Sequence, residues 1–181
     1  MPSPHHARRL NMQAFAAEAE PLVGCTLLQN MERLAQESTG LQADMTVNWQ
    51  ARAELRPGAG AEEDIWLHLQ ATTTLTLTCQ RCMGPVESPV AVDQWYRFVA
   101  TEDIAMAEDD NAEEDLLVME PQFDLLAVLE DELLMALPVV PMHEQCPVVP
   151  QLRAGELDAT DDAPKKPSPF AVLAQLKKPK K

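Results

Sequence analysis

The sequence predicts an α+β fold in which an antiparallel meander sheet of about three or more strands is packed by a long helix. Two observations predict the sheet. Residues 43–55 and 65–79 alternate strictly between apolar and polar side chains, and the alternation resumes over residues 86–98. A period of two is typical of half-buried antiparallel strands, and short loops between them favour a meander. A third observation predicts the helix, because residues 123–137 repeat leucine at helical spacing.

Two helical pieces are expected at the N-terminus, where residues 1–40 would pack on the main domain. Met12–Glu20 is rich in alanine, and Leu27–Glu37 places its apolar residues on one face. Gly24 between them indicates a turn. Cys25 beside it is most simply a small buried residue.

The alternating segments and the helix predict an α+β domain over residues 41–148. The segment 65–79 is longer than most strands, so a bulge or a strong bend is expected in it. Residues 101–120 contain nine acidic side chains and no Lys or Arg, which predicts a mobile loop. The helix should begin near Pro121, end before Pro138 and cover the apolar face of the sheet.

Two polar features of this domain have simple structural interpretations. His68 lies on the polar face of its strand among threonines, so it is expected at the surface. Glu130, Asp131 and Glu132 point in different directions on a helix, which favours an acidic solvated face over acid–base catalysis.

Residues 149–181 are predicted to be a linker followed by a flexible, basic amphipathic tail. An apolar stripe in the tail precedes a group of lysines. A tail of this kind either docks on a partner or folds back on its own domain, and the sequence leaves both readings open. The residues concerned are Phe170, Leu173, Leu176, Lys177, Lys178, Lys180 and Lys181.

The net charge of −15 is distributed unevenly along the chain. Residues 165–181 contain six lysines and no acids, so removing their charge of +6 leaves −21 on the remainder. A body this acidic repels a phosphate backbone, which argues against an autonomous nucleic-acid-binding domain. Its surface would attract basic proteins, and the lysine tail alone would contact RNA. The alternative is an acidic surface that only keeps the protein soluble.

A cytoplasmic location, away from membranes, is expected. No run in the sequence approaches the roughly 18 apolar residues that span a bilayer. Residues 1–10 lack the apolar region of a signal peptide, and the four cysteines do not resemble a secreted disulfide framework.

The cysteines nevertheless form a pattern with chemical meaning. Cys79 and Cys82 form a Cys-x-x-Cys pair at the end of a predicted strand, just before a turn at Gly84. Two such thiols provide half of a tetrahedral metal site, and His143 and Cys146 repeat the spacing in a proline-rich segment after the helix. One hypothesis is therefore a structural zinc ion bound by these four side chains. In the alternative, Cys79 is a core residue and Cys82 a partly exposed thiol.

A dithiol oxidoreductase is the enzymatic alternative. Redox Cys-x-x-Cys pairs usually open a helix, whose N-terminus lowers the thiol pKa. Here a strand pattern follows Cys82, so we expect no enzyme. Arg81, between the two cysteines, is a candidate contact for a partner.

Three segments of the chain resemble those of a known family. They are L-T-C-Q-R-C (residues 77–82), D-L-L-A-V-L-E-D-E-L-L-M-A-L-P-V-V-P-M-H (124–143) and P-S-P-F-A-V-L-A-Q-L-K-K (167–178). Their order is that of the YceD family, bacterial and plastid proteins named for large ribosomal RNA subunit accumulation. The resemblance covers the chain from about Leu22 to its C-terminus.

The resemblance implies a role in the synthesis, processing or stability of large-subunit (23S) rRNA, and hence in ribosome biogenesis, with no enzymatic activity. A ribosomal protein or a ribosome-assembly factor is then the expected partner, with rRNA contacted through the tail. Some relatives have further cysteines after the long helix, which suit a zinc site, whereas this chain has only His143 and Cys146 there.

Overall fold

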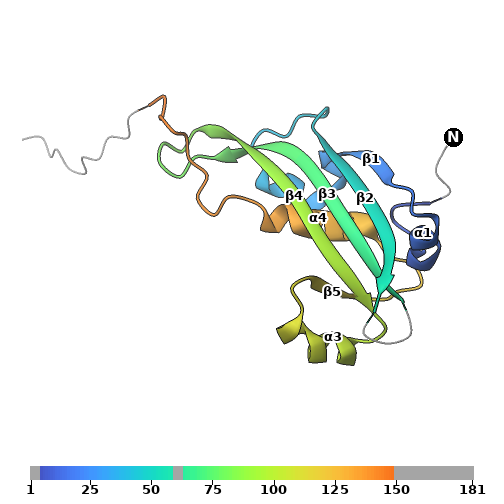
Figure 1. The fold of residues 1–181 in the computed structure, drawn as a ribbon. Coiled ribbons are helices and arrows are strands. Elements are labelled where there is room, and N and C mark those ends of the chain that lie inside the picture. Colours follow the sequence, from blue (N-terminus) through green and yellow to red (C-terminus); the bar gives the residue numbers. More distant parts are fainter. Residues whose placement is uncertain (1–4, 59–62, 149–181) are drawn as a thin grey trace, which may run out of the picture. The chain divides into compact units, whose positions relative to one another are not determined.

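A five-stranded sheet forms the centre of the structure, a computed structural model that describes residues 5–58 and 63–148. β1 to β4 pair antiparallel with their neighbours, whereas β5 pairs parallel with β4, so the sheet is mixed (Figure 1). The α+β class is confirmed, and the predicted meander is confirmed only as far as β4. The strands, in both chain and spatial order, are β1 (Leu22–Leu27), β2 (Thr46–Pro57), β3 (Glu63–Thr78), β4 (Pro85–Val99) and β5 (Asp115–Val118).

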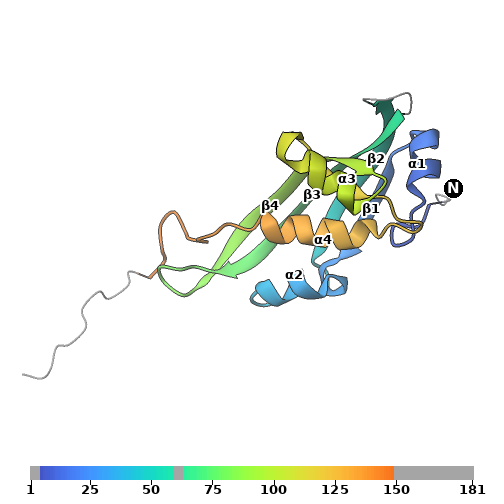
Figure 2. The same ribbon diagram turned by 90° about the horizontal axis from the view of Figure 1, so that it is seen from below.

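Four α-helices accompany the sheet in the part of the chain that the structure describes. They are α1 (Met12–Glu18), α2 (Glu32–Glu37), α3 (Glu102–Glu108) and α4 (Leu125–Met135), with short 3₁₀ helices η1 (Leu28–Asn30) and η2 (Asp109–Asn111). α4 crosses one face of the sheet, and α2 lies beside it (Figure 2).

The helix predicted over residues 123–137 is α4, which is shorter by two residues at each end. It begins after Asp124, whose carboxylate accepts a hydrogen bond from the N–H of Ala127 at 3.1 Å. Such an N-cap replaces one of the backbone bonds that a first helical turn lacks. The expected start near Pro121 is therefore wrong by one turn.

The core lies between α4 and the inner face of the sheet. Leu125, Leu129 and Leu133 on α4 are fully buried, as are Leu67 and Leu69 on β3. Burial alternates along β2 and most of β3, as the period of two in the sequence predicts. Removing these apolar side chains from water is the main favourable term in folding.

Two predictions for the N-terminal forty residues are wrong. Gly24, expected in a turn, lies inside β1 and pairs with Trp49 of β2. The helix predicted over Leu27–Glu37 is divided into η1 and α2, with Leu27 still in the strand. The reason is tertiary, because pairing with β2 extends the backbone that the local apolar spacing would have placed in a helix.

The acidic segment 101–120, predicted as a loop, contains α3 and β5. Thr101 caps α3 through its hydroxyl, which accepts the N–H of Ile104 at 3.4 Å, and Glu102 and Asp103 follow in the first turn. Acidic residues suit that position because the helix dipole is positive there. The segment is therefore ordered by local capping and by pairing of β5 with β4.

Of the bulge or strong bend expected in the long strand, the bulge is not found. The register of β3 with β2 and with β4 stays constant along both ladders, from Pro57↔Glu63 to Asn48↔Thr72 and from Trp66↔Arg97 to Thr78↔Pro85. The three long strands instead twist together over their whole length (Figure 1).

The acidic triplet on α4 is not simply a solvated face. Glu130 Oε1 accepts hydrogen bonds from the backbone N–H groups of Arg33 and Leu34, at 2.8 and 3.1 Å. These donors belong to the first turn of α2, which has no side-chain cap of its own. Glu130 therefore joins α2 to α4, and it leaves only 13% of its side chain exposed.

The division into residues 1–40, 41–148 and 149–181 stays a prediction. The described chain up to Val148 behaves as one unit. The predicted linker and tail lie outside the described residues.

Gly24→Ala is expected to lower the free energy of unfolding by about 1–3 kcal/mol, the usual cost of overpacking. A Cβ atom at this position would lie 2.1 Å from Cζ2 of Trp49. That ring is held by a hydrogen bond from its Nε1 to Thr26 Oγ1 at 2.9 Å, so it has little room to move. Urea denaturation would measure the change.

Val23→Ala on the same strand is the control for this substitution. Val23 is 69% exposed, so its truncation should change stability by no more than about 0.5 kcal/mol. Equal effects of the two substitutions would mean that Gly24 is not required by the tryptophan ring.

Candidate metal centre

The turn between β3 and β4 is closed by backbone hydrogen bonds that position two cysteines. The N–H of Cys79 donates to the carbonyl of Gly84 at 2.8 Å, and the N–H of Met83 donates to the carbonyl of Cys79 at 2.9 Å. Met83 adopts the left-handed region with a φ of 59°. The chain therefore reverses within a few residues, and Cys82 lies inside the turn.

The segment after α4 returns to this turn. The N–H of Gln80 donates to the carbonyl of Pro141 at 2.9 Å, and Nη2 of Arg81 approaches Sδ of Met142 at 3.8 Å. Figure 1 shows the segment leaving α4 and running beside the β3–β4 turn. Because prolines disfavour helical backbone, the chain stays extended over this distance and brings His143 and Cys146 with it.

Four potential metal ligands converge here, and they are the four that the sequence spacing predicts. Sγ of Cys79 lies 3.9 Å from Sγ of Cys146, and Sγ of Cys82 lies 3.5 Å from Nδ1 of His143. The ligand atoms of all four side chains lie within 4.8 Å of one another. Ligands of a tetrahedral zinc site are separated by about 3.3–3.8 Å, given bond lengths near 2.0–2.3 Å.

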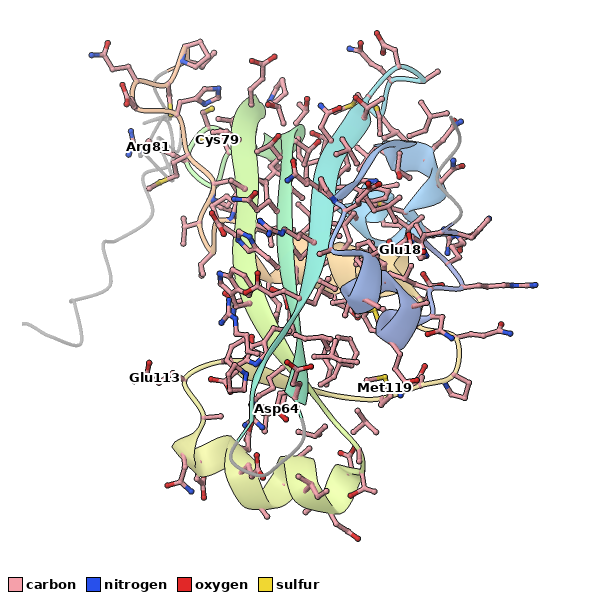
Figure 3. The ribbon with its side chains drawn as sticks, turned by 45° about the vertical axis from the view of Figure 1, so that its right-hand side comes forward. Glu18, Asp64, Cys79, Arg81, Glu113 and Met119 are labelled. Carbon is pink, nitrogen blue, oxygen red and sulfur yellow. The ribbon has the colours of Figure 1, made fainter. Side chains whose placement is uncertain are left out.

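The four side chains differ in their access to water. Cys79 is fully buried, whereas Cys82, His143 and Cys146 are half-buried. Figure 3 labels Cys79 and, beside it on the turn, Arg81, which is exposed. A group of this composition can hold a metal ion at the surface end of the core.

The polypeptide favours a thiolate at Cys79. Burial disfavours the charged form, but backbone N–H groups of Cys82, His143 and Arg81 more than offset it, so the pKa of Cys79 falls to about 5. Burial raises the pKa of Cys146, and the neighbouring sulfurs of Cys82 and Cys79 raise it further. At neutral pH the group therefore contains a negative sulfur beside a protonated one, and a bound cation would favour release of the remaining proton.

Other residues singled out in the sequence lie elsewhere. Cys25 is exposed on β1, which corrects the expectation that it is buried. The tail residues Phe170, Leu173, Leu176, Lys177, Lys178, Lys180 and Lys181 lie outside the described residues.

His68 belongs to a packed cluster on the outer face of the sheet that the sequence did not reveal. Its ring stacks on Trp95 at 4.3 Å, and its Nε2 bonds to Asp93 at 2.6 Å. The guanidinium of Arg56 covers Trp66 and Trp95 at 4.3 and 4.1 Å from the ring centroids. The alternation of side chains along β3 places Trp66 and His68 on one face. Only the register with β4 shows that Trp95 lies opposite His68.

Helices of the described chain are all too short or too polar to cross a membrane.

Reduced, metal-free protein is expected to bind one Co²⁺ per chain, with the visible absorption of a tetrahedral site and thiolate-to-metal charge-transfer bands. Cys146→Ser should lower the affinity about 100-fold or more, because a hydroxyl is a far poorer ligand than a thiolate. Absorption titration would measure both.

Cys25→Ser is the matched control, since it removes an exposed thiol from a different strand. Its titration should be unchanged. An unaltered cobalt spectrum in Cys146→Ser would exclude Cys146 as a ligand.

Comparison with known proteins agrees with the resemblance in the sequence. The family model described as "Large ribosomal RNA subunit accumulation protein YceD" matches residues 67–177. A protein of that name from Haemophilus influenzae (strain ATCC 51907 / DSM 11121 / KW20 / Rd) is 33% identical, over 86% of this chain and 86% of its own length. No solved structure matches the chain. The matched region contains the Cys-x-x-Cys turn, α4 and the segment that returns from it. The chain therefore belongs to the YceD family.

Proposed function

We propose that this chain is a non-enzymatic ribosome-biogenesis factor that supports the synthesis, processing or stability of large-subunit rRNA. The proposal rests first on membership of a family described by large ribosomal RNA subunit accumulation, and on the relative that carries that name. The factor acts in the cytoplasm and binds a ribosomal protein or a ribosome-assembly factor on its acidic surface.

The charge distribution supports contact with protein rather than RNA. Four of the seven arginines of the described chain are already paired with carboxylates. They are Arg8 with Asp124, Arg33 with Glu130 and Asp131, Arg56 with Glu54, and Arg97 with Glu108 and Glu114. Paired cations contribute little to phosphate binding, which depends on release of counterions by free Lys and Arg. The acidic surface that remains attracts basic proteins and speeds their association.

The lysine tail supplies the RNA contact in this proposal. Its four terminal lysines, Lys177, Lys178, Lys180 and Lys181, follow the apolar residues Phe170, Leu173 and Leu176. Contacts between lysines and phosphates weaken steeply with salt, so the tail alone gives weak binding without sequence preference.

The second candidate function is a structural zinc module, favoured by the convergence of Cys79, Cys82, His143 and Cys146. Zinc would fix the segment after α4 to the β3–β4 turn, and the cobalt titration above tests this site. A dithiol oxidoreductase is less well supported, because the turn leads directly into β4 and gives the cysteines no helix N-terminus.

Capture from cell lysate, with and without nuclease, is expected to show ribosomal proteins or assembly factors that stay bound after RNA is digested. The intact chain and a chain truncated before Pro167 would be compared. Weak binding of large-subunit rRNA should be measurable for the intact chain at low salt and should be lost in the truncated chain.

Two outcomes would contradict the proposal. Capture that disappears on nuclease treatment would mean that RNA, not protein, holds the complex together. Tight rRNA binding by the truncated chain at moderate salt would move the RNA contact to the folded domain.

A further inference from the structure

A groove of about 400 Å³ lies between α3, β5 and α4, away from the metal centre. Its floor is apolar and includes Leu117 of β5, Phe123 just before α4, and Val128 of α4. Its rim is acidic and includes Glu102 of α3, Glu120 and the N-cap residue Asp124, and no Lys or Arg lines it. The groove thus combines an apolar surface with one sign of charge.

The strand that forms one wall of the groove is an edge strand. β5 is the last strand of the sheet and pairs only with β4 in the part of the chain that the structure describes. Figure 3 labels Glu113 and Met119, which lie on either side of β5 and mark its course above α3. An edge strand offers unpaired backbone groups to an extended segment, which can add to the sheet as a further strand.

The rim charges are available to a partner. Glu102 and Glu120 are exposed, and neither forms an ion pair with another described residue. Asp124 is partly engaged, because it caps α4 and lies 3.5 Å from Nη1 of Arg8. Two free carboxylates therefore flank an apolar floor.

We propose that this groove binds an extended segment of a basic protein in which Lys or Arg alternates with apolar residues. The segment pairs with the free edge of β5. Since successive side chains of a strand point to opposite faces, its apolar residues lie on Leu117 and Val128 while its cations meet the acidic rim. The inference deepens the proposed function and rests on it for the identity of the partner, a ribosomal protein or assembly factor.

Charge and shape select a basic peptide over the other occupants. A nucleic acid would bring phosphates to an acidic rim, which is unfavourable. An uncharged apolar peptide would leave Glu102 and Glu120 without partners. A peptide in which cationic and apolar residues alternate can contact the apolar floor, pair its cations with the acidic rim and hydrogen-bond to the free edge of β5.

The test is a fluorescence-anisotropy titration of the full chain with a labelled synthetic peptide, about twelve residues long, in which lysine alternates with leucine. Glu102→Gln with Glu120→Gln should weaken binding about tenfold at low salt, because both free rim charges are removed. The matched control is Asp44→Asn with Glu87→Gln, two exposed acids far from the groove, which should change the affinity less than about twofold.

Two further peptides separate charge from apolar contact. Alternating glutamate and leucine should not bind, and alternating lysine and glycine should bind markedly more weakly. Hydrogen exchange gives the location. Because the N–H of Met119 donates to β4 and successive N–H groups alternate in side, the amides of Leu116 and Val118 face the free edge and should become protected when the lysine–leucine peptide binds.

The proposal is overturned by equal losses in the groove variant and the control, or by binding without protection of β5. It is also overturned if removal of residues 167–181 is needed before the peptide binds, since the occupant would then be the tail of this chain. Failure of the rRNA experiments would leave this titration unaffected, so the two proposals fail independently.

Discussion

Burial of the leucines of α4 against the long strands is the interaction on which the rest of the structure depends. Leu125, Leu129 and Leu133 are fully buried, and each contributes about 1.5–3 kcal/mol relative to an exposed side chain. This contact positions α4 along its whole length. The N-terminal end of α4 begins after Asp124, on the rim of the groove. From its C-terminal end, the chain continues to the β3–β4 turn with His143 and Cys146. Glu130 in the middle of the helix holds α2 in place. The candidate sites at the two ends of the sheet thus share one packed helix.

The segment after α4 is weakly attached to the β3–β4 turn, which explains why a metal ion would matter at this end of the sheet. The segment after α4 has one backbone hydrogen bond to the turn, from Gln80 to Pro141, and such a bond contributes only about 0.5–1.5 kcal/mol. Ordering an extended segment costs about 1–2 kcal/mol for each residue fixed. A structural metal adds binding free energy that is absent from the unfolded chain, so it would offset the cost of ordering. Its ligands span the turn and the returning segment, so it would add to the contacts that join them.

The sequence was sufficient for the elements that carry strong periodicity and insufficient for those formed by distant pairing. The alternating runs predicted β2, β3 and β4, and the leucine spacing predicted α4, because each pattern extends over many residues. β1 was missed because Gly24 indicates a turn, and only the ring of Trp49, opposite it in β2, explains why a glycine is needed in the strand. β5 was missed because four residues in an acidic segment give no measurable period. The convergence of the four metal ligands was predictable from repeated spacing, whereas the groove depends on three elements whose arrangement no local pattern contains.

One arginine adds to the capping and strand pairing that order the acidic segment. Arg97 on β4 contacts Glu108 at the end of α3 and Glu114 just before β5, and only 16% of its side chain is exposed. Burial opposes ionisation of Glu114, but the hydrogen bond from Arg97 overcomes it and holds the pKa of Glu114 below its usual value. A carboxylate with a lowered pKa stabilises the folded state above its unfolded pKa, and that stabilisation is lost as the pH falls through the folded value. The buried leucines of α4 carry no charge, so their contribution to stability does not depend on pH in this way. Acid therefore removes the stabilisation that Glu114 gives to the junction of α3, β5 and β4.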